Sequence, residues 1–222
     1  MPESGLLITF EGPEGSGKTT QIRRLQGWLE GRGHTVHVTR EPGGTPIGDA
    51  IRAVLLDPHY REMSPEAEAL LFSAARAQHV DQVIRPGLAE GITVLCDRYA
   101  DSTMAYQGYG RGLDLASLRA ITAFAIRGAV PDLTVYLDVL AAAGLERKQQ
   151  GDQAEWNRME REALSFHERV RLGFLQMAAQ EPHRWLVVDA SQPPDQVQEA
   201  IRSGVMQRLE VGDEAGDGRR QQ

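Results

Sequence analysis

Phosphate chemistry is predicted by a glycine-rich segment near the start of the chain, GPEGSGKT at residues 12–19. It fits the pattern G-x-x-x-x-G-K-[ST] and lies between an apolar run and a stretch with helical spacing. Glycines let backbone N–H groups turn toward phosphate oxygens, and the N-terminus of the following helix adds positive potential. We therefore expect Lys18 to reach the β- and γ-phosphates of a nucleotide and Thr19 to bind Mg²⁺. The alternative is a glycine-rich turn that binds nothing.

The elements that must position this segment are predicted by five short apolar runs that alternate with longer helical patterns. The runs lie at residues 6–11, 35–39, 92–97, 133–138 and 185–190. Such alternation is typical of an α/β fold with a parallel sheet and helices on both faces. Because the runs are so apolar, we expect every strand of this five-stranded sheet to be buried on both sides.

Charged side chains follow these runs, where open α/β sheets bind their ligands. Arg40, Asp97, Arg98, Asp138 and Asp189 would all lie at the carboxyl edge of the sheet. We expect Asp97 to lie near Mg²⁺ and the guanidinium fork of Arg98 to hold a second phosphate. The alternative is a surface ion pair between Asp97 and Arg98.

Phe72 and Arg76 stand four residues apart in a stretch whose start, Ser64-Pro65-Glu66, has the signals of a helix N-terminus. Residues four apart share one face of a helix. Phe72 could therefore stack on a base while Arg76 hydrogen-bonds an exocyclic oxygen of that base. The alternative places Phe72 in the core and Arg76 in solvent.

Composition limits the other possibilities. The formal net charge of −7 over 222 residues argues against nucleic acid or an anionic membrane as the main partner, because both require concentrated Lys and Arg. The single cysteine, Cys96, lies in an apolar run and is expected in the core. No leader-like or membrane-spanning stretch is evident, which favours a cytoplasmic location. We expect one domain, residues 1–210, and a frayed tail at 211–222.

Seven motifs occur in one order over most of the chain: EGPEGSGKTT, REPGGT, LLFSAARAQH, DRYADSTMAYQGYGRG, PDLTVYLD, RMERE and DASQ. In this combination the chain closely resembles the bacterial thymidylate kinases, which are P-loop NTPases. The resemblance implies a nucleoside monophosphate kinase that transfers the γ-phosphoryl group of ATP to dTMP, giving dTDP and ADP for DNA synthesis. It also implies Mg²⁺ as cofactor, a cytosolic homodimer, and a short lid at residues 146–159.

The resemblance further assigns residues to the two substrates. Glu14 would hold the sugar 3′-hydroxyl of dTMP, Arg76 would meet O4 of thymine, and Tyr106 would leave no space for a 2′-hydroxyl. The turn at 189–192 would lie beside adenine. The implied ATP-binding residues are Gly12, Pro13, Glu14, Gly15, Ser16, Gly17, Lys18, Thr19, Thr20, Arg147, Asp189, Ser191 and Gln192. The implied dTMP-binding residues are Glu14, Arg40, Phe72, Arg76, Arg98, Thr103, Tyr106 and Gln107.

The catalytic cations implied are Lys18, Arg98 and an arginine of the lid. Some relatives carry a catalytic arginine inside the phosphate loop, where this chain has Gly15, so it resembles the group with a lid arginine. Arg147 is the first candidate for that role, Arg158 the second and Lys148 the third. The alternative is that Arg147 is a solvated lid residue. This lid is poorer in arginine than the family pattern and has Asn157 where an Asp often stands.

Two other functions compete. A different nucleoside monophosphate kinase, or a deoxynucleoside kinase, would share the phosphate loop and much of the sheet, although Tyr106 and the pair Phe72 and Arg76 favour a deoxypyrimidine. A GTP-dependent switch is disfavoured, because the sequence has no Asn-Lys-x-Asp motif for guanine and carries more arginines for a second phosphate than a switch requires.

Overall fold

The five predicted strands are all present and shifted by at most one residue in the structure, a computed structural model that describes residues 5–150 and 157–217. They are β1 (Leu7–Glu11), β2 (Val36–Arg40), β3 (Thr93–Asp97), β4 (Leu133–Asp138) and β5 (Trp185–Asp189). The helices are α1 (Lys18–Glu30), α2 (Pro46–Leu56), α3 (Pro65–His79), α4 (Arg85–Ala89), α5 (Ala100–Thr103), α6 (Leu115–Ile126), α7 (Ala141–Gln150), α8 (Leu164–Gln180) and α9 (Pro194–Asp217). Two π-helical segments connect helices: η1 (Val80–Ile84) lies between α3 and α4, and η2 (Met104–Gly110) lies between α5 and α6.

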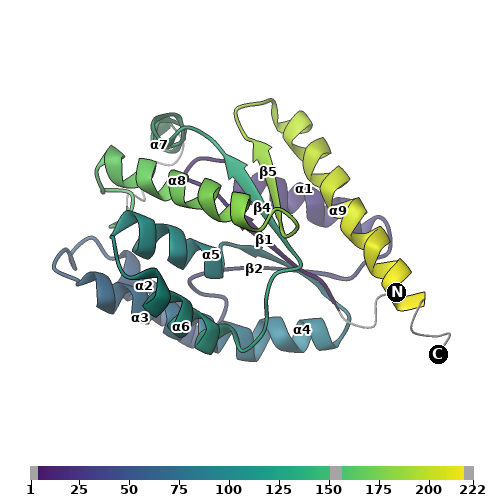
Figure 1. The fold of residues 1–222 in the computed structure, drawn as a ribbon, viewed down its shortest axis with the longest axis horizontal. Coiled ribbons are helices and arrows are strands. Elements are labelled where there is room, and N and C mark those ends of the chain that lie inside the picture. The colour runs from purple at the N-terminus through teal and green to yellow at the C-terminus, as the bar shows by residue number, and fades with distance from the viewer. Residues whose placement is uncertain (1–4, 151–156, 218–222) are drawn as a thin grey trace.

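The strands form one parallel sheet in the order β2-β3-β1-β4-β5. Helices cover both faces, as the alternation predicts (Figure 1). On one face, α1 and α9 pack on the central strands through a core that includes Ile22, Leu25 and Ile201. On the other face, η2 and α8 contribute Tyr106, Phe174 and further apolar side chains to a second core. The register places Asp97 beside Phe10 and Asp138 beside Asp189, so the carboxyl ends meet at one edge.

Burial of the sheet is uneven, and the expectation that every strand is buried on both sides is wrong for the two edge strands. Strands β1 and β3 have no exposed residue, whereas β2 exposes His37 and Val38, and Val187 of β5 is 48% exposed. An edge strand has only one neighbouring strand, and the apolar cores are centred on β1, β3 and β4. Apolar character alone therefore overstated the burial at the edges.

Local signals fixed several helix ends. The Ser64 hydroxyl accepts a hydrogen bond from the Ala67 N–H at 3.2 Å, with Pro65 at the first helical position of α3, as the sequence predicts. Gly31 follows the last residue of α1. Cys96 is buried in the core. Helix α9 reaches Asp217 and so overlaps the expected tail at 211–222, whose last residues lie outside the described part.

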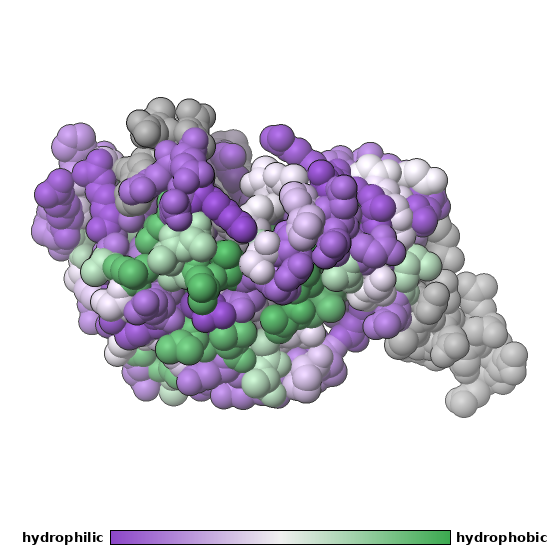
Figure 2. All heavy atoms as spheres, turned by 90° about the horizontal axis from the view of Figure 1, so that it is seen from above, coloured by the Kyte–Doolittle hydropathy of each residue, from purple (hydrophilic) through white to green (hydrophobic). Residues whose placement is uncertain are grey.

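Figure 2 shows the molecule from above, turned by 90° from the view of Figure 1. On this face, apolar patches lie among hydrophilic side chains. Helix α8 exposes Leu164 and Leu172, while its Phe166, Val170 and Phe174 are buried. Within the described residues, no helix is both long and apolar enough to span a bilayer.

Candidate active site

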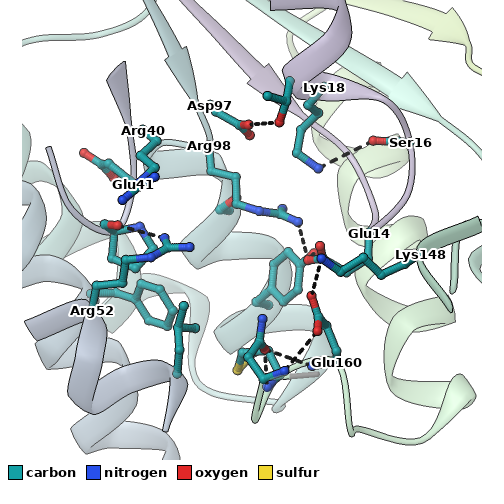
Figure 3. Close-up of a pocket in the computed structure, with 18 of the residues that line it drawn as sticks. Glu14, Ser16, Lys18, Arg40, Glu41, Arg52, Asp97, Arg98, Lys148 and Glu160 are labelled. Atoms are coloured by element: carbon teal, nitrogen blue, oxygen red, sulfur yellow. Dashed lines mark hydrogen bonds and ion pairs between the residues drawn. The ribbon is translucent and has the colours of Figure 1, made fainter. Parts of the chain in front are cut away.

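A cleft of about 1050 Å³ opens at the carboxyl edge of the sheet. The phosphate loop, residues 12–19, forms one side of it. Figure 3 shows Arg40 and Arg52 on one side of the cleft and Lys148 and Glu160 on the other, with the Arg98 guanidinium between them and directed toward Glu14. The other lining residues that matter below are Phe72, Asp97, Tyr106 and Gln107. Segments far apart in the sequence therefore meet at the edge that the strand pattern predicts.

The phosphate loop owes its shape to glycine. Gly12, Gly15 and Gly17 have φ angles of 151°, 67° and 89°, a region that side chains rarely adopt. Lys18 folds back over the loop, where its Nζ donates to the carbonyl oxygens of Gly12 and Pro13, both at 3.1 Å. Burial, reinforced by the charge of Arg98, lowers the pKa of Lys18. The ammonium is thus enclosed by the loop, where phosphate oxygens would meet it.

Helix α7 packs directly on this loop. A Cβ at Gly15 would lie 2.1 Å from the Gly144 carbonyl oxygen, so no side chain fits there without moving the helix. One turn further along α7, the Arg147 guanidinium donates to the Ala190 carbonyl at 2.9 Å. The structure therefore brings the loop, Arg147 and the turn that follows β5 together.

That turn is organised by Asp189. Its carboxylate accepts hydrogen bonds from the Ser191 hydroxyl at 2.6 Å and from the Gln192 amide at 2.8 Å. These bonds lower the pKa of Asp189 to about 2, so it is ionised at neutral pH. All three residues are exposed.

Thr19 and Asp97, the residues predicted to bind metal, are brought together. The Thr19 hydroxyl donates to Asp97 Oδ2 at 3.2 Å, at the first turn of α1 and beside Lys18. Mg²⁺ in nucleotide sites is commonly held by one or two protein oxygens together with phosphate oxygens and water. One hydroxyl and one carboxylate at the mouth of the phosphate loop fit that requirement.

Arg98 is fixed in the cleft by its backbone conformation and by two neighbouring side chains. Its φ of 67° is left-handed, which is uncommon for a residue with a side chain. The guanidinium lies 5.0 Å from the Tyr106 ring centroid, and Nη2 donates to Glu14 at 2.5 Å. Nη1 is buried, and no described residue hydrogen-bonds it. Burial by itself would lower the pKa of Arg98, but the interactions with Tyr106 and Glu14 outweigh it. The pKa is therefore raised overall, and the group stays cationic.

Arg52 joins Arg98 and Arg40 in the cleft, a residue that sequence reasoning missed. Its Nη1 donates to the Pro42 carbonyl at 2.9 Å. Burial and the charges of Arg40 and Arg98 lower the pKa of Arg52. Three like charges gathered in one cleft favour an anion between them. The available signal was its position as the only basic residue of the helix that follows the REPGGT motif.

Two glutamates flank Gly12 and Pro13 and have opposite ionisation behaviour. Burial would raise the pKa of Glu14, but the charges of Arg98 and Lys18 lower it to about 2. Glu11, which sequence reasoning also missed, is fully buried and accepts from the Tyr99 N–H at 2.9 Å. Burial and the charge of Asp101 raise the pKa of Glu11 to about 7. Glu14 therefore faces the cleft as an anion, while Glu11 braces the turn at Arg98 from behind.

The predicted base-binding residues divide into two groups. Phe72, Tyr106 and Gln107 line the cleft, whereas Arg76 and Thr103 do not. Arg76 is 1% exposed and donates to Glu41 at 2.8 Å and to the Thr103 hydroxyl at 2.9 Å. The alternative of a solvated Arg76 is therefore wrong.

The three candidate lid cations also separate. Lys148 lines the cleft, with its Nζ 3.7 Å from Glu160 Oε1. Arg147 lies beside the turn after β5, as described above. Arg158 is 7% exposed and pairs with Glu68 at 2.6 Å, and it is not among the residues that line the cleft. Residues 151–156 of the predicted lid lie outside the described part.

The comparisons with known proteins agree with this geometry. The family model for thymidylate kinase matches residues 10–201. A thymidylate kinase of Roseiflexus sp. (strain RS-1) is 54% identical over 206 residues, covering 88% of this chain and 91% of the relative. A thymidylate kinase of Deinococcus radiodurans is 54% identical, covering 92% and 98% of the two chains. The chain belongs to the thymidylate kinase family.

A solved thymidylate kinase shows the same fold. The crystal structure of thymidylate kinase from Ehrlichia chaffeensis has a TM-score of 0.73 at 32% identity, over 90% of this chain and 98% of that one. Membership confirms the predicted α/β P-loop fold and the predicted activity, transfer of the γ-phosphoryl group of ATP to dTMP. A thymidylate kinase must hold two phosphorylated substrates, and the cleft is lined by cations from the loop, Lys18, and from other segments, among them Arg40 and Arg52.

Proposed function

We propose that ATP binds with its triphosphate in the phosphate loop, and that dTMP binds opposite with its phosphate among Arg40, Arg52 and Arg98. The observation that carries this proposal is the buried Nη1 of Arg98, which has no hydrogen-bond partner among the described residues and belongs to a cluster of three arginines. An unpaired buried guanidinium nitrogen costs free energy unless an anion meets it. The acceptor phosphate supplies that anion.

The transferring group then lies between Lys18 and Arg98. Lys18 and Mg²⁺, held by Thr19 and Asp97, would neutralise the β- and γ-phosphates, and Arg98 would hold the acceptor phosphate in line for attack. Arg147 is the proposed lid cation. Its place on α7 beside Gly15 supports the role.

The base of dTMP would lie against Phe72, with Tyr106 and Gln107 beside it and Glu14 near the sugar. All four residues line the cleft. Arg76 and Thr103 are not among the residues that line the cleft, so their role as thymine ligands stays a prediction. Asp189, Ser191 and Gln192 stay predictions for the adenine side.

A panel of nucleotides tests that dTMP is the phosphoryl acceptor, and one variant tests that its base lies against Phe72. The release of ADP should be fastest with dTMP among dTMP, dUMP, dCMP, dGMP and dAMP. Phe72→Ala should weaken dTMP binding by ~1–3 kcal/mol, the usual worth of stacking a base on an aromatic ring, and leave the KM for ATP nearly unchanged. Unchanged dTMP affinity in calorimetric titration would place the base elsewhere in the cleft.

We also propose that the protein is a cytoplasmic homodimer that pairs through α3 and α6. Phe124 of α6 is 84% exposed, and Leu70 of α3 is 58% exposed. Between them runs an apolar groove of about 370 Å³ whose lining includes Ala74, Ala77 and Ala120. A protruding ring beside a groove of small residues suits a two-fold contact, in which each copy fills the groove of the other. Phe124→Asp should shift the sedimentation coefficient to that of a monomer, and an unshifted dimer would exclude this face.

A further inference from the structure

Glu68 is a fully buried carboxylate that polar and charged side chains surround. It lies on α3, is 0% exposed, and gathers three donors from other parts of the chain. Gln107 Nε2 donates to it at 2.7 Å, and Arg111 Nη2 donates at 3.0 Å. Arg158 Nη1 lies 2.6 Å from Glu68 Oε2, the oxygen that Arg111 Nη2 also contacts. Of these three donors, only Gln107 lines the cleft.

An ionised carboxylate accepts hydrogen bonds and cannot donate them. Burial would raise the pKa of Glu68, but hydrogen bonds from Arg111 and Gln107 and the charges of Arg111 and Arg158 lower it, so it is ionised at neutral pH. Because Glu68 is an acceptor only, the amide of Gln107 must turn its NH₂ group toward it. The carbonyl oxygen Oε1 is then on the other side of the amide.

The orientation of this amide decides what the cleft offers a pyrimidine ring. The hydrogen bond described for this amide is the one from Nε2 to Glu68, and the side chain lines the cleft together with Phe72 and Tyr106. An acceptor in that place suits a ring N3–H, which thymine and uracil carry. Cytosine has an unprotonated N3, itself an acceptor, which would face Oε1 without a hydrogen bond.

We propose that Glu68 is a specificity-determining positioning residue, which selects N3–H pyrimidines by holding the Gln107 amide in one orientation. This inference rests on the proposed place of the base beside Phe72. It explains why a carboxylate is buried behind the wall of the cleft, where two arginines keep it ionised. Glu68 itself touches no substrate and acts through Gln107.

The decisive variant is Glu68→Gln, which keeps the shape of the side chain but can both donate and accept. Gln107 is then free to turn over and to present NH₂ to the cleft. We expect the ratio of kcat/KM for dTMP over dCMP to fall by roughly 10- to 100-fold, the usual cost of a lost or mismatched buried hydrogen bond. The ratio for dTMP over dUMP should stay within about twofold, because both bases carry N3–H.

Glu162→Gln is the matched control, because Glu162 pairs with the same Arg111 at 2.7 Å but has no described contact with Gln107. It should leave both ratios unchanged. Gln107→Met, which retains Glu68 and both arginines, should lose the same discrimination, and the double variant should lose no more than either single one. An unchanged dTMP/dCMP ratio in either single variant overturns the proposal.

Two further measurements keep the outcome clear. If Glu68→Gln does not fold, the side-chain NH₂ signal of Gln107 in ¹⁵N NMR of the parent protein shows whether Glu68 holds this amide. Held by Glu68, it should be protected from exchange with and without dTMP, and a rapidly exchanging NH₂ overturns the proposal. The Phe72→Ala variant separates two kinds of failure. If the base does not lie beside Phe72, this variant leaves dTMP affinity unchanged. If only the role of Glu68 is wrong, Phe72→Ala still weakens dTMP binding.

Discussion

The phosphate loop and the wall opposite it line one cleft, yet they are built in different ways. The loop is a single segment, residues 12–19, in which backbone geometry and Lys18 do most of the positioning. The wall takes Arg40 from β2, Arg52 from α2, Arg98 after β3, and other side chains from α3 and η2. Several wall residues are held by partners from other segments: Arg52 by the Pro42 carbonyl, Arg98 by Glu14 and Gln107 by Glu68. Substitutions in the loop should therefore affect chemistry, and substitutions in the wall should affect binding and selectivity.

Lys18→Ala should show the largest effect. We expect the fold to survive, because the described hydrogen bonds of the side chain go to the loop itself, while kcat falls by at least roughly 10³-fold through the loss of charge stabilisation on the moving phosphoryl group. Coupled ADP-release assays, with circular dichroism to verify folding, measure this. Near-parental turnover in a folded variant would move the chemistry away from the loop.

Arg147→Ala should come next. We expect kcat to fall by roughly 10²–10³-fold with little change in dTMP affinity, as loss of one preorganised donor does. Arg158→Ala and Lys148→Ala are the matched comparisons, since Arg158 is buried against Glu68 and Lys148 lines the cleft. If Arg147→Ala stays within about threefold of the parent while one of these two variants loses activity, the role passes to that residue.

Arg52→Ala tests the wall. Removing one charge-assisted hydrogen-bond donor to phosphate should raise the KM for dTMP by roughly 10- to 100-fold and leave the KM for ATP nearly unchanged. Arg119→Ala, on the exposed side of α6, is the control. Equal changes in the two KM values would mean that loop and wall are not separate binding surfaces.

Glu11→Gln sharpens the contrast between the two glutamates through pH. The folded pKa of Glu11 is about 7 against an ordinary 4.5, so the folded state binds more protons than the unfolded state between these values. The free energy of unfolding should therefore fall by about 2 kcal/mol as pH rises from 5 to 8, and this loss should be absent in Glu11→Gln. Urea unfolding at several pH values measures it, and parallel pH profiles for parent and variant would contradict the assignment.

The fold and the loop were readable from sequence because their signals are local. Alternating apolar runs located all five strands, and Ser64 with Pro65 located the start of α3. The phosphate loop needed only its own eight residues. Burial of the edge strands was overstated, because exposure depends on strand order, which no single run contains.

The cations of the site show the limit of that reading. Lys18, Arg40 and Arg98 could be expected at the cleft because each lies in or directly after a strand or loop motif. Arg52 offered only its position in the helix after the REPGGT motif, and Glu11 offered no signal, since a helix residue and a strand residue are assigned to a cleft or a core by their neighbours in space. Arg76 shares a helix with Phe72, yet Glu41 and Thr103 hold it behind the lining.

The sequence by itself determined the parallel α/β architecture, the phosphate loop and the edge at which the substrates meet, since each follows from residue periodicity or from one contiguous motif. Only the tertiary structure decided how the side chains of the wall are oriented and ionised. Glu11 and Glu14 stand three residues apart, yet their pKa values are about 7 and about 2. The physical reason is that desolvation and charge pairing depend on distances between segments, which only the folded chain fixes.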